Sequence, residues 1–220
     1  LAFCVVMISC WFVYQPALSG PFMFDDFDNL GVMSGGVTTE NIDDYLSNGK
    51  AGPLGRPISK LSFLIDDNAW PSNAFGFKRT NLYIHLIIGV FVFIVMRLIS
   101  KTALNRKESD WFSIIVMAFF LLHPIQVSTV MYVVQRMTQL ATLFTIIGVA
   151  GHCYFRHQHV NNPINVLNLT YHSAFLLSCG LLAVFSKESG VLLPVYIAVV
   201  ELTLFSKLNS TKLYRHWRLL

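Results

Sequence analysis

Residues 82–99, LYIHLIIGVFVFIVMRLI, decide the fold class of this chain. The only side chains in this stretch that can ionise are His85, Arg97 and the phenol of Tyr83. A helix that crosses a bilayer needs about 20 mostly apolar residues, in a range of roughly 17–25. The stretch therefore predicts a transmembrane helix.

Five more apolar stretches accompany it, namely residues 1–14, 111–134, 137–155, 169–185 and 189–205. Of the 220 residues, 54% are hydrophobic and only 13% are charged, whereas soluble domains carry about 25% charged residues. So few charges cannot cover a water-facing surface. We therefore predict an all-α fold, a polytopic transmembrane helical bundle in which residues 1–220 form a single membrane domain. No basic run interleaved with aromatics suggests nucleic acid as a partner.

The stretch 111–134 is interrupted by His123 and Pro124. Its apolar part, residues 111–122, rises only about 18 Å as a helix, less than the roughly 30 Å of a bilayer core. Either the helix kinks at Pro124 and continues, or it ends there and a second short helix lies at the interface. Both alternatives put Gln135 and Arg136 on the same side.

The chain begins at Leu1 inside one apolar run and stops at Leu220 soon after another, so we interpret it as a fragment of a longer protein. The four cysteines all lie in apolar stretches without metal-ligand spacing. They indicate buried small hydrophobic residues rather than disulfides or a metal site. No cofactor is required by the sequence, which leaves the use of a divalent metal open.

The distribution of basic residues predicts the orientation in the membrane. With the loop 100–110 in the cytoplasm, nine basic residues face inside against two acidic ones, Glu108 and Asp110. The nine are Arg97, Lys101, Arg106, Lys107, Arg156, Lys207, Lys212, Arg215 and Arg218. The basic residues predicted to face outside are Lys50, Arg56, Lys60, Lys78, Arg79, Arg136 and Lys187. The acidic residues predicted to face outside are Asp25, Asp26, Asp28, Glu40, Asp43, Asp44, Asp66, Asp67 and Glu188.

Residues 15–80 form the one long extramembrane stretch and are predicted to be an extracytoplasmic first loop bearing short amphipathic helices. The stretch is rich in Gly, Pro, Asp and Asn, which favour turns. Pro57 is suited to open a short helix. Ile58, Leu61 and Ile65 would then share one apolar face, typical of a helix that lies on a membrane surface.

Several polar residues on the predicted outer side need an explanation. Adjacent Asp25 and Asp26 repel each other, and a carboxylate at a membrane surface can serve as a general base; the alternative is a solvated loop that caps a helix. Arg56 offers a planar fork suited to phosphate, or it extends toward lipid headgroups. Asn81 and His85 share one helical face, where either a substrate contact or a structural interhelical hydrogen bond would explain them.

The remaining polar residues come from two later segments. His123, Gln135 and Arg136 either contribute to a site or satisfy backbone groups freed by a proline kink. Lys187 and Glu188 occupy a turn between two apolar runs, where they pair with each other or contact a lipid phosphate. Seven of these polar residues come from separate segments but share one predicted membrane face, namely Asp25, Asp26, Arg56, His85, Arg136, Lys187 and Glu188. Such a site suits chemistry on an anionic lipid-linked substrate.

Five stretches in this order resemble a known family: FMFDDFDNL (22–30), LGRPISKLSF (54–63), FKRTNLYIH (77–85), LLHPIQVSTVMYVVQRMTQLATLF (121–144) and AVFSKESGVLLP (183–194). The chain is similar to GT-C-type membrane glycosyltransferases, in particular the transmembrane and tetratricopeptide repeat-containing O-mannosyltransferase family and its bacterial relatives. The resemblance identifies it as an N-terminal fragment of such a protein.

The resemblance implies an enzyme that transfers a sugar from a polyprenyl-phosphate carrier to a Ser or Thr hydroxyl of an exported protein. Asp25 would be the general base and Asp26 would support it. Arg56, Arg136 and Lys187 would neutralise the leaving phosphate, with Glu188 positioning Lys187. The implied partners are the lipid-linked sugar donor, the exported acceptor and membrane lipid, in a bacterial inner membrane or, in a eukaryote, the endoplasmic reticulum membrane.

Two alternative functions compete with sugar transfer. A transporter or flippase of lipid-linked saccharides would line a path across the bilayer with charges, and Glu201 is almost the only ionisable group well inside a predicted span on the inner half. A non-catalytic membrane scaffold would use the outer loop to bind a partner. Sugar transfer is the function we expect.

Overall fold

The computed structural model describes residues 1–47, 54–159 and 165–205, and these ranges are helical apart from turns and one isolated bridge between Ser34 and Trp70. Lys50 and the basic residues from Lys207 onward, which entered the orientation prediction, lie outside the described residues. The α-helices are α1 Ala2–Tyr14, α2 Asp25–Leu30, α3 Ile42–Ser47, α4 Pro57–Phe63, α5 Ala74–Ser100, α6 Arg106–Leu122, α7 Gln126–Met131, α8 Arg136–His159, α9 Val166–Ser186 and α10 Leu193–Val200. Shorter helical turns are η1 Gln15–Ala17, η2 Gly31–Met33, η3 Val133–Gln135, η4 Glu188–Leu192 and η5 Glu201–Phe205.

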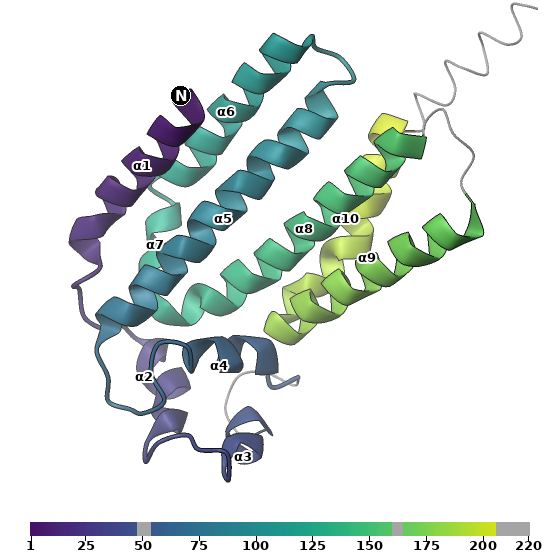
Figure 1. Cartoon of the computed structure of the whole chain (residues 1–220). Helices are drawn as coiled ribbons and strands as arrows, with labels where there is room; N and C mark the ends of the chain where they lie inside the picture. The colour runs from purple at the N-terminus through teal and green to yellow at the C-terminus, as the bar shows by residue number, and fades with distance from the viewer. Residues whose placement is uncertain (48–53, 160–164, 206–220) are drawn as a thin grey trace, which may run out of the picture.

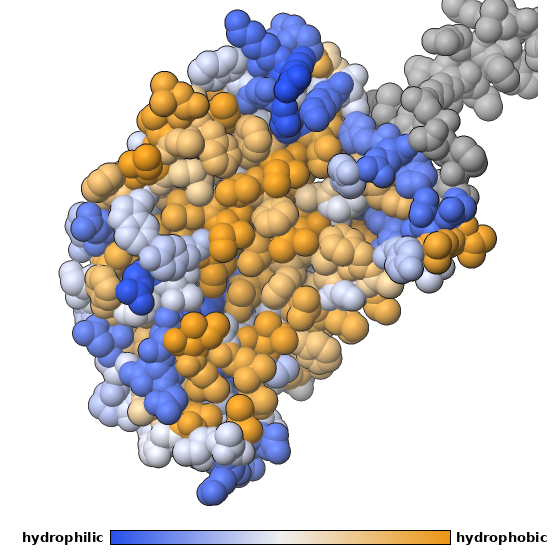
Figure 2. Space-filling model, in the orientation of Figure 1, coloured by the Kyte–Doolittle hydropathy of each residue, from blue (hydrophilic) through white to orange (hydrophobic). Residues whose placement is uncertain are grey.

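Four helical runs within these ranges are long and apolar enough to cross a membrane, namely Ala74–Ser100, Val133–His159, Val166–Ser186 and Glu188–Phe205. Ala2–Ala17 is a shorter apolar helix. The all-α prediction is thus confirmed for the described residues. Figure 2 shows a broad apolar band over the long helices, with hydrophilic residues gathered toward their two ends.

The chain leaves the helical path at His123, where the sequence offered two alternatives. α6 ends at Leu122 because His123 is extended, with φ −68° and ψ 128°, as the residue before a proline prefers. The short helix α7 follows. The alternative in which the helix ends at Pro124 is therefore the one observed, and the continuous kinked helix is wrong.

The long helices pack around α5, which lies between α6 and α8, while α9 packs on α8 (Figure 1). One apolar cluster joins α1, α5 and α6 through Tyr14, Leu82 and Leu121. A second joins α5, α8, α9 and α10 through Val95, Val149 and other side chains. Three cysteines are buried as expected, but Cys4 is exposed.

The segment between η1 and α5 forms a small helical module at one end of the long helices (Figure 1). Its core contains Leu30, Tyr45 and Phe63 together with Phe77 from α5. This module covers the end of the bundle where α5 and α8 begin and where α9 meets η4.

α4 begins at Pro57 as predicted, but its faces differ from the prediction. The helix ends at Phe63, so Ile65 does not lie on it, and Leu61 and Ile65 are exposed. The buried face instead contains the polar residues Ser59 and Lys60. Lys60 Nζ donates to the carbonyls of Tyr45 and Leu46, which compensates for its burial.

The turn η4 depends on a close approach between two backbones. A Cβ atom at Gly190 would lie 2.3 Å from the carbonyl carbon of Ala183 in α9. Only glycine fits at such a distance from main-chain atoms, which cannot move aside as a flexible side chain can. Gly190 therefore sets how tightly the turn that carries Lys187 and Glu188 packs on α9.

We expect Gly190→Ala to lower the stability of the full-length protein by about 1–3 kcal/mol, because overpacking forces backbone shifts. Thermal unfolding in detergent, followed by circular dichroism, measures the effect. The matched control is Gly180→Ala, where the new Cβ would lie 3.8 Å from Leu193 in ordinary contact. Equal unfolding temperatures for the two variants would contradict this account of the turn.

Candidate functional site

The two neighbouring aspartates at the start of α2 lie in different environments. Asp26 is fully buried, and its carboxylate accepts hydrogen bonds from the backbone amides of Met23 (3.0 Å) and Val134 (2.8 Å). Burial raises the pKa of Asp26, and these backbone hydrogen bonds oppose the rise. Asp25 is exposed, and its amide donates to the Tyr132 hydroxyl at 2.9 Å. Asp26 thus fastens α2 to the junction between α7 and α8, and Asp25 remains accessible.

Arg136, at the first position of α8, is fully enclosed by protein. Its guanidinium forms an ion pair with Asp66 at 2.6 Å, donates to Asn81 Oδ1 at 2.7 Å, and donates to the carbonyls of Ser62 and Phe77. The rings of Phe63 and Phe77 lie against its faces. The expected contact of Arg136 with a leaving phosphate is therefore replaced by a structural role, because every nitrogen of the guanidinium already has a protein partner.

Asn81 belongs to the same buried network. Its side-chain amide donates to the carbonyls of Val130 (3.2 Å) and Val133 (3.3 Å), while its oxygen accepts from Arg136. These bonds tie α5 to the irregular backbone between α7 and α8. Of the two explanations for Asn81, the geometry favours the structural interhelical hydrogen bond.

Arg56 forms the second charged contact of the site, with Glu188. Arg56 Nη2 lies 2.8 Å from Glu188 Oε2, and Arg56 Nε also donates to this carboxylate. The two side chains keep exposures of 22% and 34%, so solvent or a ligand can reach the pair. A further hydrogen bond, from Ser59 Oγ to the carbonyl of Ser186 at 2.8 Å, holds α4 against the end of α9. Glu188 thus forms its ion pair with Arg56, while its charge also acts on the neighbouring Lys187, whose pKa it raises.

Lys187 is positioned by α8 instead. Its Nζ donates to Thr138 Oγ1 at 2.7 Å, and Thr138 donates in turn to Gln135 Oε1 at 2.7 Å. Gln135 therefore acts on Lys187 through Thr138. Partial burial lowers the pKa of Lys187 and the positive charge of Arg56 lowers it further, while the carboxylate of Glu188 opposes this fall.

The two predicted histidines lie apart from these charged contacts. His85 is buried within the bundle, where its Nε2 lies 3.2 Å from the carbonyl of Leu121 and its ring packs against Tyr14 and Phe120. His123 accepts a hydrogen bond from the amide of Ile125 at the turn after α6. Both contacts are the structural ones that the sequence offered as alternatives.

The contacts converge on the short stretch that opens α8. Asp26 binds the amide of Val134, whereas Arg56 Nη1 lies 3.3 Å from Met137 Sδ. Val134 and Met137 are three residues apart, so their Cα atoms lie within about 11 Å of each other. α2, α4 and the turn after α9 therefore meet at one end of the bundle (Figure 1).

Backbone strain also occurs here. Of the described non-glycine residues, only Phe24 and Arg56 have positive φ, at 40° and 51°. Phe24 directly precedes Asp25, and Arg56 itself supplies a guanidinium group to the site. Such strained positions persist only where surrounding contacts hold them, and they concentrate at functional sites.

Sequence reasoning missed the residues that support the site. Tyr132 and Thr138 lie within the quoted stretch 121–144, but a lone hydroxyl gives no signal of its partner. Asp66 was assigned only to the acidic outer surface, and nothing in its surroundings marks it as the partner of Arg136. Three His, Cys, Asp or Glu side chains suited to hold a metal ion are not found together in the described part of the chain.

Comparison with protein-family models, with curated proteins and with solved structures finds no match to this chain. The function must therefore be argued from the geometry above and from the motifs in the sequence.

Replacing Arg136 tests its structural role. We expect Arg136→Met to destabilise the protein by about 3–5 kcal/mol, because it leaves the Asp66 carboxylate buried without its partner. Denaturant unfolding of the solubilised protein measures the loss. Arg79→Met, at an exposed position of the same end, is the control and is expected to stay within about 0.5 kcal/mol of the native protein. Equal free energies of unfolding for the two variants would show that Arg136 does not hold this end of the bundle together.

Proposed function

We propose that this chain is part of a polytopic membrane glycosyltransferase of the GT-C type. In this proposal it transfers a sugar from a polyprenyl-phosphate carrier to a Ser or Thr hydroxyl of an exported protein. The observation that carries the proposal is that Asp25, Arg56 and Lys187 come from three separate segments and each contacts the stretch between Tyr132 and Thr138 at one end of the bundle. An accessible carboxylate and two partly exposed cations at the same end of the bundle suit attack by a hydroxyl with departure of a phosphate.

The charge distribution supports placing this site on the non-cytoplasmic side. In the described residues, the opposite end of the bundle holds five basic side chains against three acidic ones, whereas the end with the site holds six basic side chains against nine acidic ones. The five basic side chains are Arg97, Lys101, Arg106, Lys107 and Arg156. Basic residues are enriched on the cytoplasmic side of membrane proteins. The apolar band between the two ends supports embedding of the long helices in lipid (Figure 2).

The proposed reaction assigns one role to each accessible side chain. Asp25 removes the proton of the acceptor hydroxyl as its oxygen forms a bond to the anomeric carbon from the side opposite the leaving group. The bond between that carbon and the phosphate oxygen breaks, and its electron pair stays on the phosphate. Lys187 and Arg56 stabilise the negative charge that remains there. Inversion at the anomeric carbon follows from this single displacement.

The aspartate pair gives the sharpest test of the proposed base. We expect Asp25→Asn to reduce transfer from a polyprenyl-phosphate sugar to peptide by about 10²–10⁴-fold with unchanged stability. Asp26→Asn should instead destabilise the fold by about 1.5–3 kcal/mol, because an amide cannot accept both backbone hydrogen bonds as a carboxylate does. Activity and unfolding are measured on the same full-length preparations.

The same assay separates the competing functions. Full transfer activity in Asp25→Asn would refute the proposed base. Movement of the lipid-linked sugar across a vesicle membrane without transfer would favour a transporter. Neither transfer nor movement in the full-length protein would favour a scaffold.

Lys187 should give donor binding a characteristic pH dependence. Its ammonium binds phosphate only while protonated, and its pKa is lowered, so affinity should fall as the pH rises through a range below that of an ordinary lysine. Lys187→Arg should keep its affinity there, since arginine stays charged. Lys187→Met should lose about tenfold or more at neutral pH. Donor binding is measured from pH 7 to 10, with exposed Lys107→Met as control; an identical alkaline loss in Lys187→Arg would show that another group titrates.

A further inference from the structure

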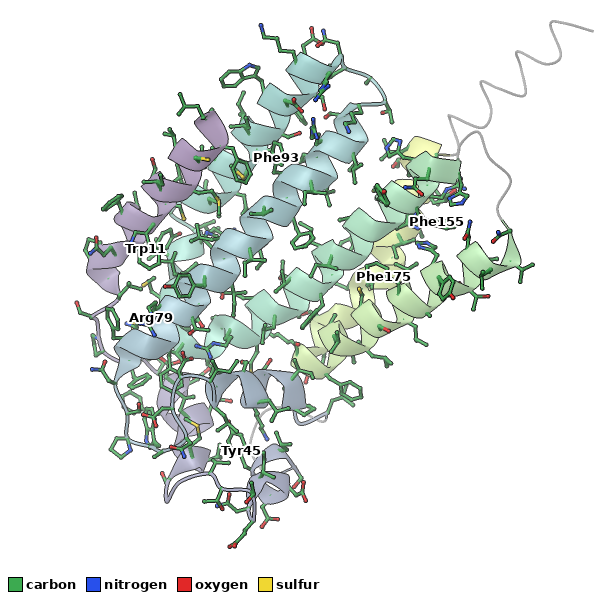
Figure 3. All side chains as sticks on the ribbon, in the orientation of Figure 1. Trp11, Tyr45, Arg79, Phe93, Phe155 and Phe175 are labelled. Atoms are coloured by element: carbon green, nitrogen blue, oxygen red, sulfur yellow. The ribbon has the colours of Figure 1, made fainter. Side chains whose placement is uncertain are left out.

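The hydroxyl of Tyr132 lies beside the residue to which the proposed reaction assigns the role of base. It accepts a hydrogen bond from the amide of Asp25 at 2.9 Å, although the two residues are 107 positions apart. Polar side chains are dense in this part of the molecule, between Tyr45 of the small helical module and Arg79 of α5 (Figure 3). Tyr132 is half-buried, whereas Asp25 is exposed.

The backbone around Tyr132 is held from several directions. Its amide donates to the carbonyl of Ser128 at 3.2 Å, and its carbonyl accepts from the side chain of Asn81 at 3.4 Å. Two residues later, the amide of Val134 donates to the buried Asp26 at 2.8 Å. The ring is thus carried by a fixed stretch of backbone, so its hydroxyl has a defined place relative to α2.

The amide of Asp25 needs the partner that Tyr132 supplies. It is the first amide of α2, and the first amides of a helix have no acceptor within the helix. Phe24, the residue before it, offers no side-chain cap and has a strained φ of 40°. The hydroxyl of Tyr132 therefore satisfies this amide and helps to fix where α2 begins.

The same hydroxyl keeps its own hydrogen for a second contact. A hydroxyl can accept and donate at the same time, whereas an ionised carboxylate can only accept. The hydroxyl is also in hydrogen-bond contact with the side chain of Asp25. Tyr132 therefore donates to the carboxylate while it accepts from the amide. These two bonds hold one residue by both its backbone and its side chain.

We propose that Tyr132 is a positioning residue for the base, which it serves by holding the ionised carboxylate of Asp25 in a single orientation. This inference rests on the proposed function. An exposed aspartate turns about its side-chain bonds, whereas reaction requires that the groups involved are held in one geometry. The proton of the acceptor hydroxyl passes to a carboxylate oxygen of Asp25, and the phenol hydrogen stays on Tyr132 throughout.

The kinetic test compares Tyr132→Phe with the native full-length protein in transfer from a polyprenyl-phosphate sugar to peptide. We expect kcat to fall about 10–100-fold, as for the loss of a hydrogen bond to a charged group. KM for the donor should stay within about twofold of the native value, because donor binding does not use this hydroxyl. Tyr83→Phe, at an exposed position of α5, is the matched control and should transfer sugar like the native protein.

A double-mutant cycle separates positioning of the carboxylate from capping of α2. If Tyr132 acts through the carboxylate, adding Tyr132→Phe to Asp25→Asn should change the residual rate less than about twofold. A hydroxyl that only caps α2 would cause the same fold loss in both backgrounds, because the amide of residue 25 is present in both. Such an equal loss would overturn the proposal, and so would a native kcat in Tyr132→Phe.

Ionisation of the phenol provides a readout that does not depend on sugar transfer. Burial raises the pKa of Tyr132, the amide of Asp25 opposes the rise, and the carboxylates of Asp25 and Asp26 add to it. Asp25→Asn should therefore lower the pH at which Tyr132 ionises, since removing a negative charge favours the phenolate. Glu40→Gln, at an exposed position of the same module, is the control and should leave that pH unchanged. Phenolate absorbance is measured as the difference from the same proteins carrying Tyr132→Phe.

These outcomes separate the inference from the function on which it rests. An absence of transfer in the native protein would refute both. Transfer that is lost in Asp25→Asn but kept in Tyr132→Phe would refute the role of Tyr132 alone. If Tyr132→Phe does not fold, the phenolate absorbance of the native protein and of Asp25→Asn is compared directly, and an unchanged midpoint would overturn the proposal.

Discussion

The enclosed guanidinium of Arg136 is the interaction on which the end of the bundle depends. A buried charge is tolerated only with a counter-ion and a full set of hydrogen bonds, and here these come from Asp66, Asn81 and two backbone carbonyls. The partners belong to the loop after α4, to α5 and to the end of α4. One side chain thereby fixes the small helical module against the long helices. Arg136 itself opens α8, the helix whose Thr138 contacts Lys187 and whose Met137 contacts Arg56.

The site divides its charged residues into two groups by burial. Asp26 and Arg136 are fully buried and hold α2 and α8 in place. Asp25, Arg56 and Lys187 are carried on the elements thus fixed and keep at least partial exposure. Preorganised groups stabilise developing charge best when they need no rearrangement during reaction. The buried residues therefore serve the proposed chemistry by holding the exposed ones, without contacting substrate.

Sequence reasoning predicted what depends on local patterns. Long apolar runs predicted the helices, Pro57 predicted the start of α4, and Pro124 marked the interruption of the third stretch. It could not predict which member of a pair is buried, because Asp25 and Asp26 are chemically identical and differ only in what tertiary contact supplies. The pairing of Glu188 with Arg56 was missed for the same reason: the two residues are 132 positions apart in the sequence, so only the tertiary fold brings them together.

The placement of charge along the helices bears on the choice between transfer and transport. Within the described parts of the four long helical runs, the charged side chains lie toward the ends: Lys78, Arg79 and Arg97 in the first, Arg136 and Arg156 in the second, and Glu188 and Glu201 in the last. Between those ends the helices meet through apolar clusters. A carrier that moves a sugar across the bilayer would need polar groups along the way, since polar groups in lipid must be satisfied. Here charged pairs lie at both ends of the bundle, such as Arg56 with Glu188 at one end and Arg97 with Asp110 at the other, and the described long helical runs carry no charged side chain between those ends. The continuous polar path that a carrier needs is therefore not seen in the described residues, whereas an enzyme needs polar groups at one face only.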